Sequence, residues 1–269
     1  MARSRDGQPI HYHVEGQGDP ALVFVHCWAC DRHLWDEQVA TFATRHRVVT
    51  LDLAGHGESG HTRAEWTVAA FGEDVRAVVE ALDLRGVLLI GHSLGGPVIL
   101  EAATKMPDRV EALVPVDSLL NVGEQSTPEE VDAFLAPFRA DYKTASAKFV
   151  REWMFVPASG PKLMERIAAQ AASAPPNMSI DTLRHVWLYD TRPALRQIKV
   201  PIRALNADKF PTHLDAARAE APQFDAVIMT GVGHYLMLED PQRFDRLLAE
   251  IIANVTRAGP GPGAPARRP

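Results

Sequence analysis

The chain has little cysteine: Cys27 and Cys30 are the only two among its 269 residues. So few cysteines exclude a fold that depends on a framework of disulfides. Their C-x-x-C spacing also occurs in redox and zinc sites, but zinc needs about four ligands and no second cysteine or histidine pair completes the set. We expect two reduced thiols on a loop, with redox or metal function as the alternative, and neither metal nor cofactor.

Long hydrophobic runs and an excess of basic charge are also missing. No apolar run approaches the roughly 18 residues that a membrane-spanning helix needs, and residues 1–7 lack the apolar core of a signal peptide. The formal net charge of -6 offers no basic face to nucleic acid or anionic lipid. We therefore expect a cytoplasmic protein with no membrane span and no nucleic-acid partner.

Strand and helix signals alternate along most of the chain. This alternation predicts an α/β fold, with a mainly parallel sheet covered by helices on both faces. Strand patterns lie at residues 10–14, 21–26, 47–51, 86–90, 112–116, 202–206 and 226–230, and helical patterns at 31–42, 68–82, 94–106 and 240–256.

The alternation breaks after Asp117. Residues 119–190 contain helical patterns such as 128–138 and 143–155, no convincing strand, and many aromatic and methionine side chains. These side chains could form a plain helical core, but they also suit the apolar roof of a pocket. We expect a helical cap (lid) here, inserted after the strand ending near Val116.

The remaining domain boundaries follow from this insertion. The α/β core is expected to comprise residues 1–118 and 191–257, while the Gly- and Pro-rich residues 258–269 cannot pack and predict a disordered C-terminal tail. The residues that we expect to line a substrate pocket are Cys27, Trp153, Met154, Trp187 and Tyr235.

The sequence Gly91-His92-Ser93-Leu94-Gly95 fits the pattern G-x-S-x-G and lies between an apolar strand and a helical stripe. A serine in so tight a strand-to-helix turn is held above the sheet, and the first amides of the helix stay free to bind negative charge. The alternative is a serine that only caps the helix. The context favours Ser93 as a nucleophile.

A serine hydroxyl needs a base to take its proton. His234 is the candidate base, because loops at the carboxyl ends of parallel strands converge and it follows the last strand. A carboxylate must then hold the imidazole in the correct tautomer. We expect Asp208, after strand 202–206, to be this acid, with Asp117 as the alternative.

The tetrahedral intermediate of acyl transfer needs two N–H donors aimed at its oxyanion. The backbone amide of Leu94, the residue after the nucleophile, is one candidate. The second is expected from the loop after strand 21–26, where we choose the amide of Trp28, with that of Cys27 as the alternative. His26 is expected to stabilise a turn through hydrogen bonds.

These motifs together resemble the α/β-hydrolase superfamily, and within it the capped serine esterase-like group. The resemblance extends from about residue 8 to 256 and implies the α/β-hydrolase fold. One position departs from the family pattern: the family usually has glycine where this chain has Cys27, which puts the geometry of the oxyanion loop in doubt. The motifs that carry the resemblance are His26-Cys27-Trp28, Asp52 to Ser59, Gly91 to Gly96, Asn206-Ala207-Asp208 and Gly233-His234-Tyr235.

Serine with histidine and aspartate fits acyl transfer to water. We expect hydrolysis of small to medium carboxylic esters or lactones through an acyl-enzyme intermediate, by a monomer or a homodimer. The resemblance leaves alternatives with the same triad: a C–C bond hydrolase, an amidase or a perhydrolase. A slow-turnover ligand sensor with a hydrolase fold is a further alternative, since a fold does not determine a function.

Overall fold

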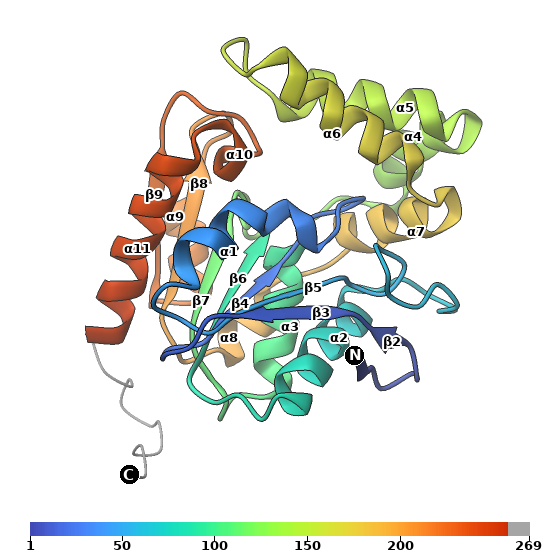
Figure 1. The fold of residues 1–269 in the computed structure, drawn as a ribbon. Coiled ribbons are helices and arrows are strands. Elements are labelled where there is room, and N and C mark those ends of the chain that lie inside the picture. The colour runs from blue at the N-terminus through green and yellow to red at the C-terminus, as the bar shows by residue number, and fades with distance from the viewer. Residues whose placement is uncertain (258–269) are drawn as a thin grey trace.

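A seven-stranded sheet forms the centre of the molecule, in a computed structural model that describes residues 1–257 (Figure 1). The strand order is β3-β5-β4-β6-β7-β8-β9, and only β3 runs antiparallel to its neighbour. This arrangement confirms the predicted α/β fold. The strands are β3 (Tyr12–Glu15), β4 (Leu22–Val25), β5 (Val48–Leu51), β6 (Val87–His92), β7 (Val110–Val116), β8 (Ile202–Ala207) and β9 (Phe224–Met229).

The central strands are mostly apolar because both faces of the sheet are covered. Every residue of β4, β5 and β6 is buried. Helices α2, α3 and α8 pack together on one face, and α1 packs against α11 on the other. The helices of the core are α1 (Asp36–Phe42), α2 (Val68–Ala81), α3 (Gly95–Lys105), α8 (Arg192–Gln197), α9 (Leu214–Glu220), α10 (Leu236–Glu239) and α11 (Pro241–Arg257).

Between β7 and the core helix α8, which precedes β8, the chain forms four α-helices, of which α4, α5 and α6 stand apart from the sheet as a separate layer (Figure 1). The first of them begins at a capping box, in which Thr127 and Glu130 bond each other's backbone N–H groups. The predicted helix at 143–155 is interrupted, since a π-helical turn, Val150–Met154, follows α5. These helices are α4 (Pro128–Ala140), α5 (Tyr142–Phe149), α6 (Pro161–Ser173) and α7 (Pro176–Trp187).

Smaller elements complete the chain. A two-stranded hairpin, β1 (Ala2–Arg3) with β2 (Pro9–Ile10), precedes the main sheet, and the predicted strand at 10–14 is divided between β2 and β3. The predicted tail at 258–269 lies outside the described residues. Within residues 1–257, no helix is both long and apolar enough to cross a bilayer.

Candidate active site

The turn at Ser93 has the strained geometry predicted for it. β6 ends at His92, α3 begins at Gly95, and Ser93 has a φ of 53°, which a side-chain-bearing residue rarely adopts. A Cβ at Gly91 would lie 2.2 Å from the carbonyl oxygen of Gly95, and one at Gly95 would lie 2.6 Å from that of Val25. The glycines therefore let the start of α3 approach β6 and the end of β4.

His234 is bonded to a carboxylate. Its Nδ1 lies 2.6 Å from Oδ2 of Asp117, and both residues are buried. The second oxygen, Oδ1, accepts a hydrogen bond from the amide of Ala207 at 2.9 Å. Because an ionised carboxylate only accepts hydrogen bonds, Nδ1 of the neutral imidazole carries the proton and Nε2 keeps its lone pair. This is the tautomer that a general base requires.

Asp208 does not occupy the position that the sequence suggested. It is exposed, and its Oδ1 accepts a hydrogen bond from the amide of Gly231 at 2.8 Å. The structure thus corrects the expectation that Asp208 lies beside the histidine and places the alternative, Asp117, there. Asp117 follows β7, the neighbour of β6, and the amide of Ser93 donates to the carbonyl oxygen of the preceding Val116 at 2.9 Å. Asp208 instead follows β8 and bonds Gly231, just after the end of β9.

His92 contacts the loop that carries His234 as well as the core. The ring is fully buried, and its Nε2 donates to the carbonyl oxygen of His234 at 2.8 Å. Burial, with His234 nearby, lowers the pKa of His92 well below its ordinary value, so the ring is neutral. No local pattern in the sequence indicates this hydrogen bond, because it joins residues 142 positions apart.

The loop after β4 is held by His26. Its Nδ1 donates to the carbonyl oxygen of Cys27 at 2.7 Å, and its Nε2 accepts from the amide of Leu53 at 3.0 Å. Burial lowers the pKa of His26, which keeps the ring neutral and able to make both bonds. In a trans peptide the C=O and N–H point in opposite directions. Holding the Cys27 carbonyl therefore directs the Trp28 N–H away from His26.

Cys27 and Cys30 form a disulfide in the structure, with their Cα atoms 5.4 Å apart. This corrects the expected pair of reduced thiols. A turn brings the residues together, because the amide of Cys30 donates to the carbonyl oxygen of Cys27 at 3.3 Å. The positive φ of this turn, 54°, belongs to Ala29, so position 27 does not need a glycine. Among the described residues, no group of three or more metal-ligating side chains is suited to an ion.

The residues expected to line a pocket have different environments. Tyr235 is buried and stacks on Phe155, and Cys27 is buried with its sulfur 3.9 Å from the Tyr235 hydroxyl. Met154 is half-buried. Trp153 and Trp187 are 56% and 45% exposed, so the structure corrects the expectation that these two indoles are enclosed.

Sequence reasoning missed that the Trp28 side chain contacts the helices between β7 and β8. Its indole Nε1 donates to the carbonyl oxygen of Ser179 in α7 at 2.9 Å. The ring also packs edge-on against Phe138, Tyr142 and Phe149, which come from α4 and α5. The aromatic richness of residues 119–190 was the available signal, but it could not indicate which core residue these rings enclose.

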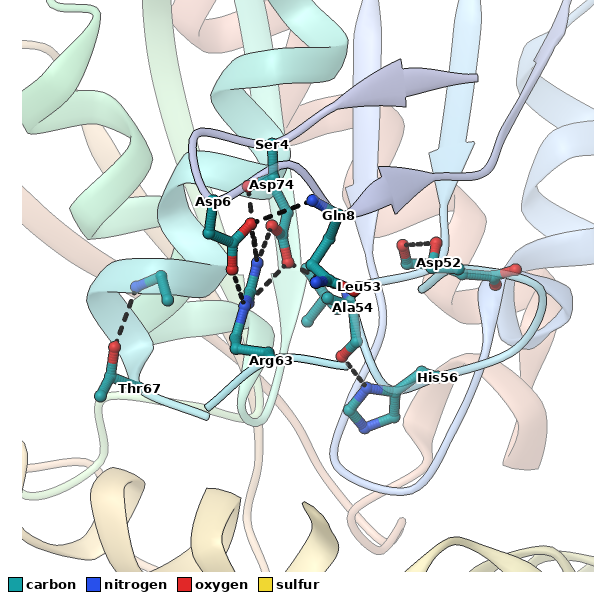
Figure 2. A network of polar contacts seen from close by, with 12 residues as sticks. Ser4, Asp6, Gln8, Asp52, Leu53, Ala54, His56, Arg63, Thr67 and Asp74 are labelled. Carbon is teal, nitrogen blue, oxygen red and sulfur yellow. Dashed lines mark hydrogen bonds and ion pairs between the residues drawn. The ribbon is translucent and has the colours of Figure 1, made fainter. Parts of the chain in front are cut away.

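A buried ion pair supports the loop that follows β5. Figure 2 shows Arg63 between Asp74 of α2 and Asp6 near the N-terminus. Asp74 also accepts a hydrogen bond from the amide of Ala54 at 3.0 Å, and the neighbouring Leu53 bonds His26. Burial raises the pKa of Asp74, and Arg63 opposes that shift. The ion pair thus anchors the chain that holds His26.

Replacing Arg63 by alanine is expected to lower the free energy of unfolding by about 3–5 kcal/mol, because Asp74 would stay buried without its charged partner. Urea denaturation followed by circular dichroism measures the change. Arg76→Ala is the matched control, since it breaks only partly exposed ion pairs and is expected to change stability by less than about 1 kcal/mol. Equal losses in the two variants would contradict an anchoring role for Arg63.

Replacing His26 by alanine is expected to lower kcat for an ester substrate by about tenfold to a hundredfold, somewhat less than the loss of a complete oxyanion donor. The reason is that the Cys27 carbonyl, and with it the Trp28 amide, would lose its orienting bond. Steady-state kinetics at a temperature where both proteins are folded gives the value. His46→Ala, which removes a hydrogen bond to Pro20 elsewhere, serves as the control. An unchanged kcat in His26→Ala would refute the orienting role.

Comparisons with known proteins come from sequence and from structure. A family model described as the alpha/beta hydrolase family matches residues 22–247. A pimeloyl-[acyl-carrier protein] methyl ester esterase of Methylococcus capsulatus is 30% identical, covering 90% of this chain and 97% of that protein. A 3-oxoadipate enol-lactonase of Acinetobacter baylyi is 25% identical, covering 95% and 97%.

The solved structure of an esterase from Exiguobacterium antarcticum superimposes with a TM-score of 0.85 at 20% identity, covering 94% of this chain and 98% of that one. Three uncharacterized mycobacterial proteins are 35% identical over 116 residues, and the matched part spans 34% of their length. The structural likeness extends over nearly the whole chain, including the helices between β7 and β8.

Proposed function

Because the chain belongs to the alpha/beta hydrolase family, we propose that it is a serine hydrolase that cleaves small to medium carboxylic esters or lactones. The observation that carries the proposal is the 2.6 Å bond between His234 and Asp117, next to the strained turn of Ser93, whose amide bonds the carbonyl oxygen of Val116 at 2.9 Å. The matches to a methyl ester esterase and to an enol-lactonase support this substrate class.

The proposed reaction begins with proton transfer. Nε2 of His234 takes the proton of the Ser93 hydroxyl as its oxygen attacks the acyl carbon, and Asp117 stabilises the imidazolium that forms. The amides of Leu94 and Trp28 bind the oxyanion of the tetrahedral intermediate. His234 then protonates the leaving alcohol, which leaves Ser93 acylated.

The second half of the proposed reaction uses the same groups. A water molecule gives its proton to His234 and attacks the acyl carbon, and the second tetrahedral intermediate collapses to the acid as His234 returns the proton to the Ser93 oxygen. A lactone follows the same path, except that its alcohol stays attached to the acyl group. Asp117 is assigned the role that the sequence gave to Asp208, because its carboxylate lies against the imidazole.

The test is hydrolysis of nitrophenyl esters from acetate to octanoate, together with a lactone series followed by proton release. Turnover with a chain-length optimum would support the proposal and indicate the size of the acyl pocket. A stoichiometric burst of nitrophenol without steady-state turnover would overturn it in favour of a ligand sensor or of a hydrolase for another bond. Competition between lactones and esters would show that both use one site.

A further inference from the structure

The end of the π-helical turn contacts the loop that carries His234 directly. The amide of His234 donates to the carbonyl oxygen of Met154 at 2.7 Å, although these residues are 80 positions apart. The carbonyl oxygen of His234 accepts from His92 at 2.8 Å. Both backbone groups of His234 are therefore bonded: its carbonyl oxygen to His92 of β6 and its amide to Met154. π-helical turns are often found at functional sites.

Glu239, in α10, joins the same two segments through its side chain. Its Oε2 accepts hydrogen bonds from the amide of Gly233 at 3.0 Å and from the hydroxyl of Ser159. Ser159 belongs to the cap segment, and its Oγ also accepts from the amide of Val156 at 3.1 Å. One half-buried carboxylate therefore links the cap segment to the residue before His234.

Close packing brings the two backbones together at Gly233. A Cβ at this position would lie 2.6 Å from the carbonyl oxygen of Met154, 2.9 Å from Oε1 of Glu239 and 3.0 Å from Cα of Phe155. Phe155 stacks on Tyr235 with ring centroids 5.4 Å apart. The Phe155 carbonyl oxygen also accepts from Nζ of Lys209 at 3.1 Å. The contact is thus tight as well as polar.

We propose that Glu239 is a positioning residue, which with Ser159 latches the cap segment 154–159 to the loop of His234 and so sets the position of the imidazole. The inference rests on the proposed function, since it gives the cap a part in aligning the base of that reaction. Two bonds of the latch join at one oxygen, so releasing Ser159 loosens the cap side while the Gly233 bond remains. A small misplacement of a catalytic group lowers the rate strongly.

The polar part of the latch is tested with Ser159→Ala, Glu239→Ala and the double variant. We expect kcat for the best nitrophenyl ester to fall by about tenfold in Ser159→Ala and by about a hundredfold in Glu239→Ala, with little change in KM. The double variant should be no slower than Glu239→Ala, because both changes release one latch. Glu239→Gln keeps an acceptor oxygen and should recover most of the rate. Glu250→Gln, an exposed position in α11, is the control.

The steric part is tested with a pair of Gly-to-Ala variants. Gly233→Ala pushes the Met154 backbone away without removing a polar group, whereas Gly160→Ala adds its Cβ where no atom lies within 4 Å. We expect the first to lower kcat by at least about tenfold and the second to leave it unchanged. A merely structural role predicts lower melting temperatures with an unchanged kcat, and that result would overturn the proposal.

A readout independent of turnover separates this inference from the proposed function. Hydrogen exchange of the peptide 231–236 should be faster in Ser159→Ala and Glu239→Ala than in Glu250→Gln, because the His234 amide would lose its protected bond. If the variants exchange faster at residues 231–236 but the unmodified protein does not turn over esters, the proposed ester hydrolase function is wrong and the latch is supported. Unchanged exchange and kcat, in a protein that hydrolyses esters, would overturn the latch alone.

Discussion

Replacing Ser93 by alanine is expected to lower ester turnover by at least about a thousandfold, because the nucleophile that forms the acyl-enzyme would be gone. The fold should persist, since alanine fits wherever the serine side chain does and the positive φ at this position strains both residues alike. Initial rates with the best nitrophenyl ester measure the loss, and circular dichroism checks the fold.

Two further measurements sharpen this expectation. Ser173→Ala, at an exposed serine that ends α6, is the matched control and should keep full turnover. A fluorophosphonate probe should label the unmodified protein and Ser173→Ala but not Ser93→Ala. Near-normal turnover by Ser93→Ala would rule out the serine mechanism and with it the proposed function.

Exchanging Asp117 for asparagine is expected to lower kcat by about three to four orders of magnitude. Its Oδ1 accepts from the amide of Ala207, so an asparagine that keeps this bond turns its NH₂ group toward Nδ1 of His234. Nδ1 must then accept rather than donate, which moves the ring proton to Nε2. In that tautomer Nε2, to which the proposed reaction gives the Ser93 hydroxyl proton, has no lone pair to take it.

Asp208→Asn is the matched comparison, because Asp208 is exposed and its Oδ1 accepts only from the amide of Gly231. Asparagine can keep that bond, so kcat should stay close to that of the unmodified protein. Steady-state kinetics on both variants decides between the two aspartates. A large loss in Asp208→Asn with a small one in Asp117→Asn would return the acid to the position that the sequence favoured.

The sequence predicted the fold because its signals were local. Apolar runs between glycines mark the buried strands, and the G-x-S-x-G turn needs only its flanking strand and helix to be recognised. The sequence also predicted that His26 stabilises a turn through hydrogen bonds, and its Nδ1 bonds the carbonyl oxygen of the neighbouring Cys27. Each of these features depends on short segments whose residues decide their own conformation.

The features that the sequence could not predict depend on distant segments. Asp117 and Asp208 both follow strands, and only the paths of the loops after those strands decide that Asp117 reaches His234 while Asp208 bonds Gly231. The bond from His234 to Met154 depends on where the cap segment comes to lie. The exposure of Trp153 depends on the same packing, because an apolar side chain in a sequence does not indicate whether another element will cover it.

The placement of Trp28 limits how freely the parts of this enzyme can be exchanged. Its backbone belongs to the core, but its indole is bonded to Ser179 and enclosed by rings of α4 and α5. In a chimaera whose helices α4 to α7 came from another family member, the Trp28 indole would lose the carbonyl oxygen and the aromatic rings that it contacts. The core of such a chimaera would therefore need a different residue at position 28. At this contact, the core and the helices α4 to α7 can change only together.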